Sequence, residues 1–331
     1  MSALVLLLGW FAGWLLFVGL RRCASGPNEC DVVRKLSVII PARDEEENLP
    51  RLLRSVSADV HEVIVVDDCS RDRTRTVAQE HGARVIDGAP PPNGWRGKTW
   101  ACHQGANAAT GELLFFLDAD TWLERGGLAG IANEFRDGAV SIAPYHCVPT
   151  IREQFSAFFN VVMLAGAGPN HLLGQSLLIA SATYDNFGGH RAVKDQLLEN
   201  FALGQRLRGT TRSRLGRGVL NVRMYPHSWR EMIDGWSKSF AAGASQTSPV
   251  RLALIIIWIT GCVLALSHIA AYALFVLQIA ILLRRIGRYR VLTAVLYPLP
   301  LLFFFGVFAR SVVRARTRES ILWKGRPVRA A

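Results

Sequence analysis

The stretch Leu113-Leu-Phe-Phe-Leu-Asp-Ala-Asp120 decides the fold, because a short apolar run passes directly into a pair of aspartates. Two similar runs precede it, Leu36-Ser-Val-Ile-Ile40 and Glu62-Val-Ile-Val-Val66. Polar segments with helical spacing separate the three runs: 44–56 lies between the first and the second, and 71–81 and 98–109 lie between the second and the third. Strands that alternate with helices predict an α/β fold, a mostly parallel sheet covered by helices on both faces.

Acidic residues follow each of the three predicted strands. The first strand is followed by Pro41-Ala-Arg-Asp-Glu-Glu-Glu47, the second by Asp67-Asp-Cys-Ser70 and the third by Asp118-Ala-Asp120. A single turn of this kind would be an ordinary helix cap. Three at the carboxyl edge of one sheet repel each other unless a cation or a hydrogen-bonding ligand lies there, and this edge is where such folds bind ligands.

Asp118 and Asp120 form a DxD pair that suits Mg²⁺ or Mn²⁺. These hard cations take oxygen ligands and keep several waters, so one or two carboxylates and two phosphates are enough to hold one. The metal would neutralise the charge that develops on a diphosphate leaving group. DxD is a weak motif alone and a stronger one after the acidic turn at Asp67.

Lys98 stands at the start of a predicted helix, in Trp95-Arg-Gly-Lys98. A glycine turn with a lysine at a helix start favours anions, so Lys98 is expected to hold a phosphate or the base. A solvated surface lysine is the alternative. The proline-rich loop 89–95, which precedes Lys98, is either a connector or a lid over the bound nucleotide donor.

The composition points to a membrane protein, since 50% of the 331 residues are hydrophobic and the net charge is +12. The uncharged run Ala3–Leu20 is long enough to span a bilayer and has no basic residues before it, which predicts an uncleaved anchor over 1–22. Arg21 and Arg22 then place a catalytic domain over 31–245 in the cytoplasm.

Two further apolar runs predict C-terminal membrane segments over 250–310. Leu252–Leu283 fits either one long tilted helix or a hairpin of two, and Val291–Ala309 is interrupted by two prolines. Basic residues gather at the ends of the apolar runs and in a predicted cytoplasmic tail over 311–331, which is typical of a multi-pass protein of the cell membrane and disfavours nucleic acid as a partner. The six cysteines form no CxxC pair, so reduced, buried thiols are expected.

These motifs, in this order and spacing, resemble the nucleotide-sugar transferases of glycosyltransferase family 2. Motifs in the second half resemble the carotenoid-acid glycosyltransferases of the 4,4'-diaponeurosporenoate type: Pro144-Tyr-His146, Phe155-Ser-Ala-Phe-Phe-Asn160, Gly188-Gly-His190, Glu199-Asn-Phe-Ala-Leu-Gly204, Arg223-Met-Tyr225, Gly235-Trp-Ser-Lys238 and Trp323-Lys-Gly-Arg326. The resemblance covers residues 36 to 326. It implies a GT-A fold, an inverting mechanism, a UDP-sugar donor with glucose as the expected sugar, and a divalent metal.

The resemblance also implies roles for individual residues. Pro41, Arg43 and Glu45 would line the nucleotide pocket together with Lys98, and Asp68 would contact the uracil. Asp118 would lie near the ribose and the sugar, and Asp120 would hold the metal.

The acceptor motif departs from the family pattern. Many members end it in Glu-Asp, with the aspartate as catalytic base, whereas this chain has Glu199-Asn200. Asn cannot take a proton at neutral pH. Glu199 is therefore the expected base, with Asp195 as a rival if the segment is helical, and an inactive chain is the alternative.

Four further residues are candidates for the acceptor side. Gly189 and His190 follow a glycine, where the chain is expected to turn sharply, and His190 either contacts the acceptor or a phosphate or caps a helix. Trp236 and Lys238 precede an apolar run, so they suit the lipid headgroup level, and Lys238 is also a candidate for the diphosphate.

The leading function is transfer of a sugar to a lipophilic acceptor, such as a carotenoid carboxylate or hydroxyl, with membrane lipids as surroundings. Polyprenyl phosphate and glycerolipid acceptors stay open, because the donor half does not separate them. Asn200 motivates a catalytically inactive membrane scaffold as a further alternative. A nucleotidylyltransferase is disfavoured, because the first strand lacks the Gly-rich basic loop that such enzymes carry.

Overall fold

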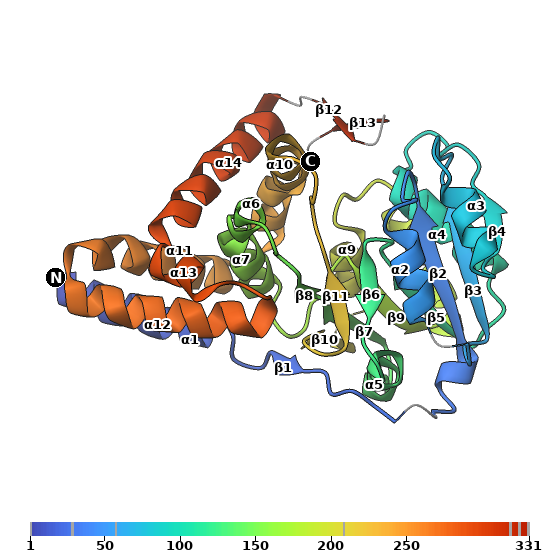
Figure 1. The fold of residues 1–331 in the computed structure, drawn as a ribbon, viewed down its shortest axis with the longest axis horizontal. Helices are drawn as coiled ribbons and strands as arrows, with labels where there is room; N and C mark the ends of the chain where they lie inside the picture. Colours follow the sequence, from blue (N-terminus) through green and yellow to red (C-terminus); the bar gives the residue numbers. More distant parts are fainter. Residues whose placement is uncertain are drawn as a thin grey trace. The chain divides into compact units, whose positions relative to one another are not determined.

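The computed structural model describes residues 2–27, 30–56, 58–207, 209–317, 320–323 and 326–329. The chain forms two compact units (Figure 1). The sheet unit contains Arg21–Tyr145 and Asn170–Val222, and the helical unit contains Met1–Leu20, His146–Pro169 and Arg223–Ala331. The expected catalytic domain of 31–245 is thus divided, because its segments 146–169 and 223–245 fold with the apolar helices.

The sheet unit is built on eight strands in the order β1-β10-β7-β9-β5-β2-β3-β4. Their bounds are β1 Arg21–Arg22, β2 Leu36–Ala42, β3 Glu62–Asp67, β4 Arg84–Asp87, β5 Leu113–Leu117, β7 Ala139–Ala143, β9 Ser176–Ala180 and β10 Thr211–Leu215. All neighbours are parallel except that β9 runs antiparallel to both β5 and β7. The predicted mostly parallel sheet is confirmed.

Helices cover both faces of this sheet (Figure 1). One face carries α2 (Leu49–Ser55), α3 (Thr74–Glu80) and α5 (Gly127–Glu134), and the other carries α4 (Gly97–Ala108), α8 (Ser181–Asn186) and α9 (Glu199–Arg206). Within β2, Val38 and Ile40 face the first layer and Ile39 faces the second. Because both faces are buried in the middle of the sheet, the central strands β2, β3, β5, β7 and β9 read as mostly apolar runs, unlike β1, β4 and β10.

Smaller elements complete the sheet unit. β6 (Thr121–Leu123) pairs antiparallel with β11 (Leu220–Val222) in a second sheet, whose third strand is β8 (Tyr145–His146). Two short 3-10 helices are η1 (Val33–Lys35) and η2 (Gly189–Val193). All six cysteines of the chain are free thiols, and Cys69 is exposed, contrary to the expectation that all are buried.

Arg21 and Arg22 belong to the sheet as well as to the charge pattern. They form β1, which pairs in parallel with β10, and the Arg22 guanidinium donates to the carbonyl of Arg217 (2.7 Å). The sheet unit therefore begins directly after Leu20.

The helical unit gathers the apolar segments of the chain. Its elements are α1 (Ser2–Leu15), α6 (Ile151–Gln154), α7 (Ala157–Ala167), α10 (Trp229–Gln246), α11 (Pro249–Leu264), η3 (Ala265–Ser267), α12 (Ile269–Ile286), α13 (Val291–Val295), α14 (Pro298–Thr317), β12 (Ser320–Trp323) and β13 (Arg326–Arg329). The run 252–283 forms two helices, α11 and α12, so the hairpin alternative is confirmed. Within the part of the chain that the structure describes, three helical stretches are long and apolar enough to cross a membrane: Pro249–Ser267, Ile269–Ile286 and Pro298–Thr317.

Helix α1 is shorter than the uncharged run predicts. It has 14 residues and ends at Leu15, which corresponds to a length of about 21 Å against a hydrocarbon core of about 30 Å. It packs closely on α11 and α12, because a Cβ at Gly9 would lie 2.8 Å from Cα of Gly261. The buried Gln278 amide donates to the Trp10 carbonyl (2.6 Å). Small residues such as Gly9 and Gly261 let α1 and α11 approach closely, and the uncleaved anchor stays a prediction.

The C-terminal segment contains regular secondary structure in addition to its basic residues. Helix α14 continues to Thr317. Arg310 and Arg314 bind the Asp234 carboxylate of α10, at 3.2 Å and 3.0 Å. β12 and β13 then pair as an antiparallel hairpin. Residues 318, 319, 324, 325, 330 and 331 of the expected tail lie outside the described residues.

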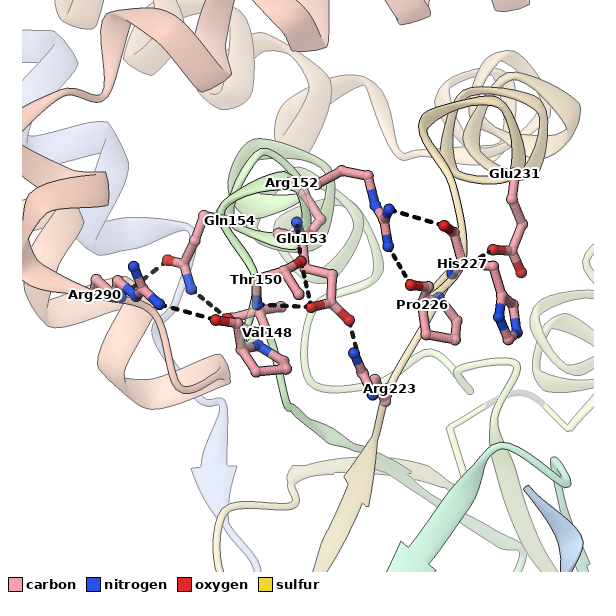
Figure 2. Close-up of polar contacts among 12 residues, drawn as sticks. Val148, Thr150, Arg152, Glu153, Gln154, Arg223, Pro226, His227, Glu231 and Arg290 are labelled. Carbon is pink, nitrogen blue, oxygen red and sulfur yellow. Dashed lines mark hydrogen bonds and ion pairs between the residues drawn. The ribbon is translucent and has the colours of Figure 1, made fainter. Parts of the chain in front are cut away.

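A polar network surrounds the short helix α6 (Figure 2). The carboxylate of the buried Glu153 accepts from the Arg223 guanidinium (2.7 Å) and from both the backbone and the hydroxyl of Thr150 (2.8 and 2.7 Å). Arg152 donates to the carbonyls of Pro226 and His227. Burial would raise the pKa of Glu153, but these donors outweigh it and lower that pKa. The network fixes the chain just before α10.

Candidate active site

The loops after β2 and β3 are joined by hydrogen bonds. The strands end in register, with Ala42 opposite Asp67. The Arg43 guanidinium donates to the Asp68 carbonyl (2.6 Å). The Asp44 carboxylate accepts from the Arg71 backbone N–H (2.7 Å). These bonds make the two loops one rigid rim at the carboxyl edge of the sheet.

The acidic side chains of this rim bind backbone amides. Asp72 accepts from the N–H of Glu46 (3.0 Å) and of Thr74 (3.0 Å), and Glu46 accepts from the N–H of Arg73 (2.9 Å). Burial would raise the pKa of Asp72, but the hydrogen bonds to its charged form outweigh it and lower that pKa. The expectation that these acidic turns need a cation or a ligand is therefore wrong for Asp44 and Glu46, whose carboxylates accept from backbone N–H groups, as that of the nearby Asp72 does.

The predicted nucleotide-pocket residues lie on this rim. Pro41 is the second-last residue of β2 and pairs with Val66 of β3. The Glu45 backbone donates to Thr74 (2.8 Å), and the Glu45 carboxylate accepts from Asn48 (2.8 Å). Asp68 is buried directly after β3. The structure thus gathers Pro41, Arg43, Glu45 and Asp68 at one edge, and their contact with a nucleotide stays a prediction.

The third acidic turn contacts the ammonium group of a lysine. After β5 the chain turns tightly, with the Thr121 N–H and hydroxyl both donating to the Asp118 carbonyl (3.1 and 2.7 Å). The Lys98 ammonium of α4 lies 2.7 Å from Oδ1 of Asp118 and 2.8 Å from Oε1 of Glu199 on α9. It also donates to the Gly174 carbonyl (2.9 Å). The two predicted catalytic carboxylates are therefore held together by one lysine.

Burial and the opposite charges act in opposing directions on this cluster. The side chain of Glu199 is 7% exposed, that of Asp118 27% and that of Lys98 38%. Burial opposes the charge on Lys98, but the two carboxylates outweigh it and raise the pKa of Lys98 well above its usual range. Burial would also raise the pKa of Glu199, yet Lys98 lowers it overall, whereas burial prevails at Asp118 and raises its pKa. Glu199 is thus ionised at neutral pH. Lys98 is paired with two carboxylates and is not a solvated surface lysine, and its expected contact with a phosphate or the base stays a prediction.

The residues at the end of β5 fit a divalent cation bound together with a diphosphate. The Lys98 cluster has two carboxylates, Asp118 and Glu199, for one ammonium, and Asp120 follows Asp118 by two residues. Across the described ranges no group of three or more His, Cys, Asp or Glu could form a full metal cage. One or two carboxylates with phosphate and water ligands are how Mg²⁺ is usually held, so the donor set suits such an ion.

The structure gives Asn200 a defined role and weakens Asp195 as a candidate. The buried Asn200 amide donates to the carbonyls of Leu173 (2.9 Å) and Gly174 (3.2 Å). Helix α9 begins at Glu199, so Asp195 is not on the same helical face, and it is exposed. Glu199, and not Asp195, is the carboxylate beside Asp118.

Gly189 and His190 are part of the core. The His190 backbone donates to the Tyr184 hydroxyl (3.0 Å), which also lies 2.9 Å from Nδ1 of the ring. Burial lowers the pKa of His190 to about 3, so the ring is neutral. Gly189 has a φ of +47°, and a Cβ there would overlap the Tyr184 ring. Both residues thus pack against Tyr184, and contact of His190 with an acceptor or a phosphate stays a prediction.

Trp236 and Lys238 lie on α10 in the helical unit. Trp236 is buried and stacks on Phe159, with centroids 5.0 Å apart and an interplanar angle of 17°. It contributes to an aromatic core that also includes Phe240. Lys238 is half-buried on the same helix, and its role with a diphosphate stays a prediction.

Sequence reasoning missed the segment Leu173–Gln175 and the side chain of Tyr184. The Leu173–Gln175 backbone contacts α4, α9 and β5, and Tyr184 anchors His190. The segment Leu173–Gln175 has no recognisable sequence motif, because it makes its hydrogen bonds through backbone carbonyl oxygens and not through side chains. A buried tyrosine six positions before His190 was a possible signal, but only the fold brings the two together.

Known proteins similar to this chain cover nearly all of it. The family described as glycosyl transferase family 2 matches residues 37–193. A 4,4'-diaponeurosporenoate glycosyltransferase of Staphylococcus haemolyticus is 34% identical over 336 aligned residues, covering 90% of this chain and 89% of that protein. A protein of the same name from Staphylococcus aureus is 31% identical and covers 88% of each chain.

A solved structure resembles the whole chain. It is a mannosyltransferase from Pyrobaculum calidifontis in complex with GDP-Man and Mn²⁺, with a TM-score of 0.58 and 16% identity. The match covers 94% of this chain and 93% of the mannosyltransferase. At this identity the likeness concerns the fold.

Proposed function

The chain belongs to glycosyltransferase family 2 and is a glycosyltransferase with a GT-A fold, and from this we propose that it transfers a sugar from a UDP-sugar to the carboxyl group of a carotenoid acid. The observation that carries the proposal is the cluster of Lys98, Asp118 and Glu199 at the carboxyl edge of the sheet. The name of the Staphylococcus relatives supports the acceptor.

The donor is proposed to bind along the rim after β2 and β3. Pro41, Arg43 and Glu45 would line the nucleotide, and the buried Asp68 would accept from the uracil. Because the rim loops are already tied together by hydrogen bonds, they need little reordering when the nucleotide binds. UDP and glucose follow from the family resemblance, and GDP is a competing nucleotide for the experiment below.

Asp120, with Asp118 beside it, is proposed to hold Mg²⁺ or Mn²⁺. Such an ion neutralises the leaving diphosphate when bound. The Pyrobaculum mannosyltransferase structure contains Mn²⁺. The excess of carboxylates over ammonium groups in this cluster attracts a cation before the donor arrives.

The transfer step is proposed to invert the anomeric centre. A carboxylate oxygen of the acceptor attacks the anomeric carbon from the side opposite UDP, a carbon–oxygen bond forms, and UDP leaves with the electron pair of the broken bond. A carboxylic acid is already ionised near neutral pH, so no proton has to be removed. With a hydroxyl acceptor, Glu199 would take the proton. Lys98 keeps Glu199 ionised and therefore able to accept it.

The helical unit is proposed to bring the acceptor to this enzyme. Three of its helices are long enough to span a bilayer, and a lipophilic acceptor dissolves in that bilayer. We place the enzyme in the cell membrane as a multi-pass protein, with the sheet unit and the C-terminal segment in the cytoplasm. Nucleotide sugars are made there, and Arg21 and Arg22 satisfy the positive-inside rule.

The experiment incubates the purified protein in detergent with radiolabelled UDP-glucose, other UDP-sugars and GDP-mannose. Each donor is offered a carotenoid acid, the matching carotenoid alcohol, polyprenyl phosphate, a glycerolipid extract and a soluble oligosaccharide. We expect label to enter the organic phase with a UDP-sugar and the carotenoid acid. Efficient transfer to the oligosaccharide, with none to the lipids, would refute a lipophilic acceptor.

A further inference from the structure

The segment Leu173–Gln175 presents three consecutive backbone carbonyls to helix α9, helix α4 and the turn that follows β5. The Leu173 carbonyl accepts from Asn200 of α9 (2.9 Å), and the Gly174 carbonyl accepts from Lys98 of α4 (2.9 Å). The Gln175 carbonyl accepts from the backbone N–H of Asp118 (3.1 Å). This carbonyl segment therefore touches the residues on either side of the reaction centre.

Asn200 is suited to hold this segment. Its NH₂ group carries two hydrogens and donates to the carbonyls of Leu173 (2.9 Å) and Gly174 (3.2 Å). The residue is 3% exposed, so water does not readily replace either bond. A carboxylate at the same place has no hydrogen to donate and would face two carbonyl oxygens.

The Gly174 carbonyl connects Asn200 with the lysine. The Lys98 ammonium has three hydrogens, and three acceptors lie around it: Asp118 (2.7 Å), Glu199 (2.8 Å) and the Gly174 carbonyl (2.9 Å). If the carbonyl segment moves, Lys98 loses its only uncharged acceptor of these three. It would then shift toward whichever carboxylate is closer, and the separation of Asp118 and Glu199 would change.

We propose that Asn200 is a positioning residue whose amide fixes the Leu173–Gln175 carbonyls and, through Gly174, holds Lys98 between Asp118 and Glu199. Asn at this place is then a requirement of the site and not a sign of lost activity. The inference rests on the proposed function only in taking the Lys98 cluster as the active site. It assigns no new role to the acceptor.

The test compares Asn200→Asp, Asn200→Ala and the wild-type protein between pH 5 and pH 8. Asn200→Asp can donate a hydrogen bond only when protonated, so its folded-state pKa is raised. Such a group contributes stability below its unfolded pKa, and this contribution is lost as the pH rises through the folded pKa. We therefore expect its Tm deficit to grow from pH 5 to pH 8, reaching about 2–6 °C. Asn200→Ala should show a deficit that does not change with pH.

Turnover should follow the same pattern. At pH 8, kcat of Asn200→Asp should fall about tenfold or more, with a smaller change in the KM of the donor, and part of the loss should return at pH 5.5. The exposed Asn186→Asp on α8 is the matched control and should behave as wild type in both measurements. Equal Tm and kcat for Asn200→Asp and wild type at pH 8 would overturn the proposal, and so would a pH-independent loss. If no donor and acceptor pair gives turnover with wild type, the proposed function fails while the Tm series still decides the role of Asn200.

Discussion

The acidic residues at the sheet edge form two regions that look alike in sequence and differ in what they bind. In the rim after β2 and β3, Asp44, Glu46 and Asp72 accept hydrogen bonds from backbone N–H groups of the neighbouring loop. After β5, Asp118 shares an ammonium with Glu199. The carboxylates of the first region join the loops after β2 and β3, whereas those of the second region stay ion-paired with a lysine side chain and can take part in the reaction.

The difference follows from the partners that each region meets. Backbone N–H groups are fixed by the fold, so a carboxylate bound to them is part of the scaffold. An ammonium on a lysine side chain can move when a metal or a substrate arrives. Carboxylates of the first kind should therefore affect stability when removed, and those of the second kind should affect turnover.

The largest effect is expected for Asp120→Asn. Loss of one carboxylate at the proposed metal position should reduce kcat about a thousandfold, because charge neutralisation at the leaving diphosphate is worth several kcal/mol. The Tm should change little. EDTA should abolish transfer by the wild type, and Mn²⁺ or Mg²⁺ should restore it.

The matched control is Asp185→Asn, an exposed aspartate on α8 with the same change of chemistry. It should keep wild-type turnover. Full activity of the wild type in EDTA after exhaustive dialysis would contradict a metal at Asp120.

A smaller effect is expected for Glu199→Gln, and its size should depend on the acceptor. With a hydroxyl acceptor, loss of a general base costs about a hundredfold or more in kcat. With a carboxylate acceptor the loss should be smaller, because no proton has to be removed. The measurement is kcat with a carotenoid alcohol and with the matching carotenoid acid.

Asp195→Asn is the comparison variant, because Asp195 is exposed and lies before α9. It should retain activity with both acceptors. Near-wild-type rates for Glu199→Gln with both acceptors, together with a loss for Asp195→Asn, would transfer the role of base to Asp195.

The sequence was sufficient to predict a mostly parallel sheet and the edge of that sheet where the candidate site residues gather. The strands 36–40, 62–66 and 113–117 are apolar on both faces, so their pattern is strong, and their carboxyl ends meet at one edge by the rules of parallel sheets. It was insufficient for β7, β9 and β10, whose pairing depends on contacts distant in the chain.

The partners of the charged residues could not be predicted for the same reason. Lys98 stands at a helix start, which favours an anion, but its actual partners come from β5 and α9. His190 and Trp236 were read from their neighbours in sequence, whereas the packing of Tyr184 and Phe159 buries them. Local patterns predict where a residue lies along the chain, and only the fold determines which side chain faces it.

The smallest effect is expected for Asp72→Ala, which tests whether the rim carboxylates are scaffold. The variant loses the bonds that Asp72 accepts from the N–H groups of Glu46 and Thr74, so the free energy of unfolding should fall by about 1–3 kcal/mol at pH 7. Because the folded-state pKa of Asp72 is lowered, its contribution is present above the unfolded value and is lost as the pH falls through the folded one. The difference from wild type should therefore shrink below about pH 4. The kcat at a temperature well below the Tm should stay within about twofold of wild type, since Asp72 does not belong to the Lys98 cluster. Thermal unfolding and kcat are measured on Asp72→Ala and on Asp185→Ala, which should match wild type in both. A large loss of kcat with an unchanged Tm would place Asp72 with the catalytic carboxylates and break the distinction between the two acidic regions.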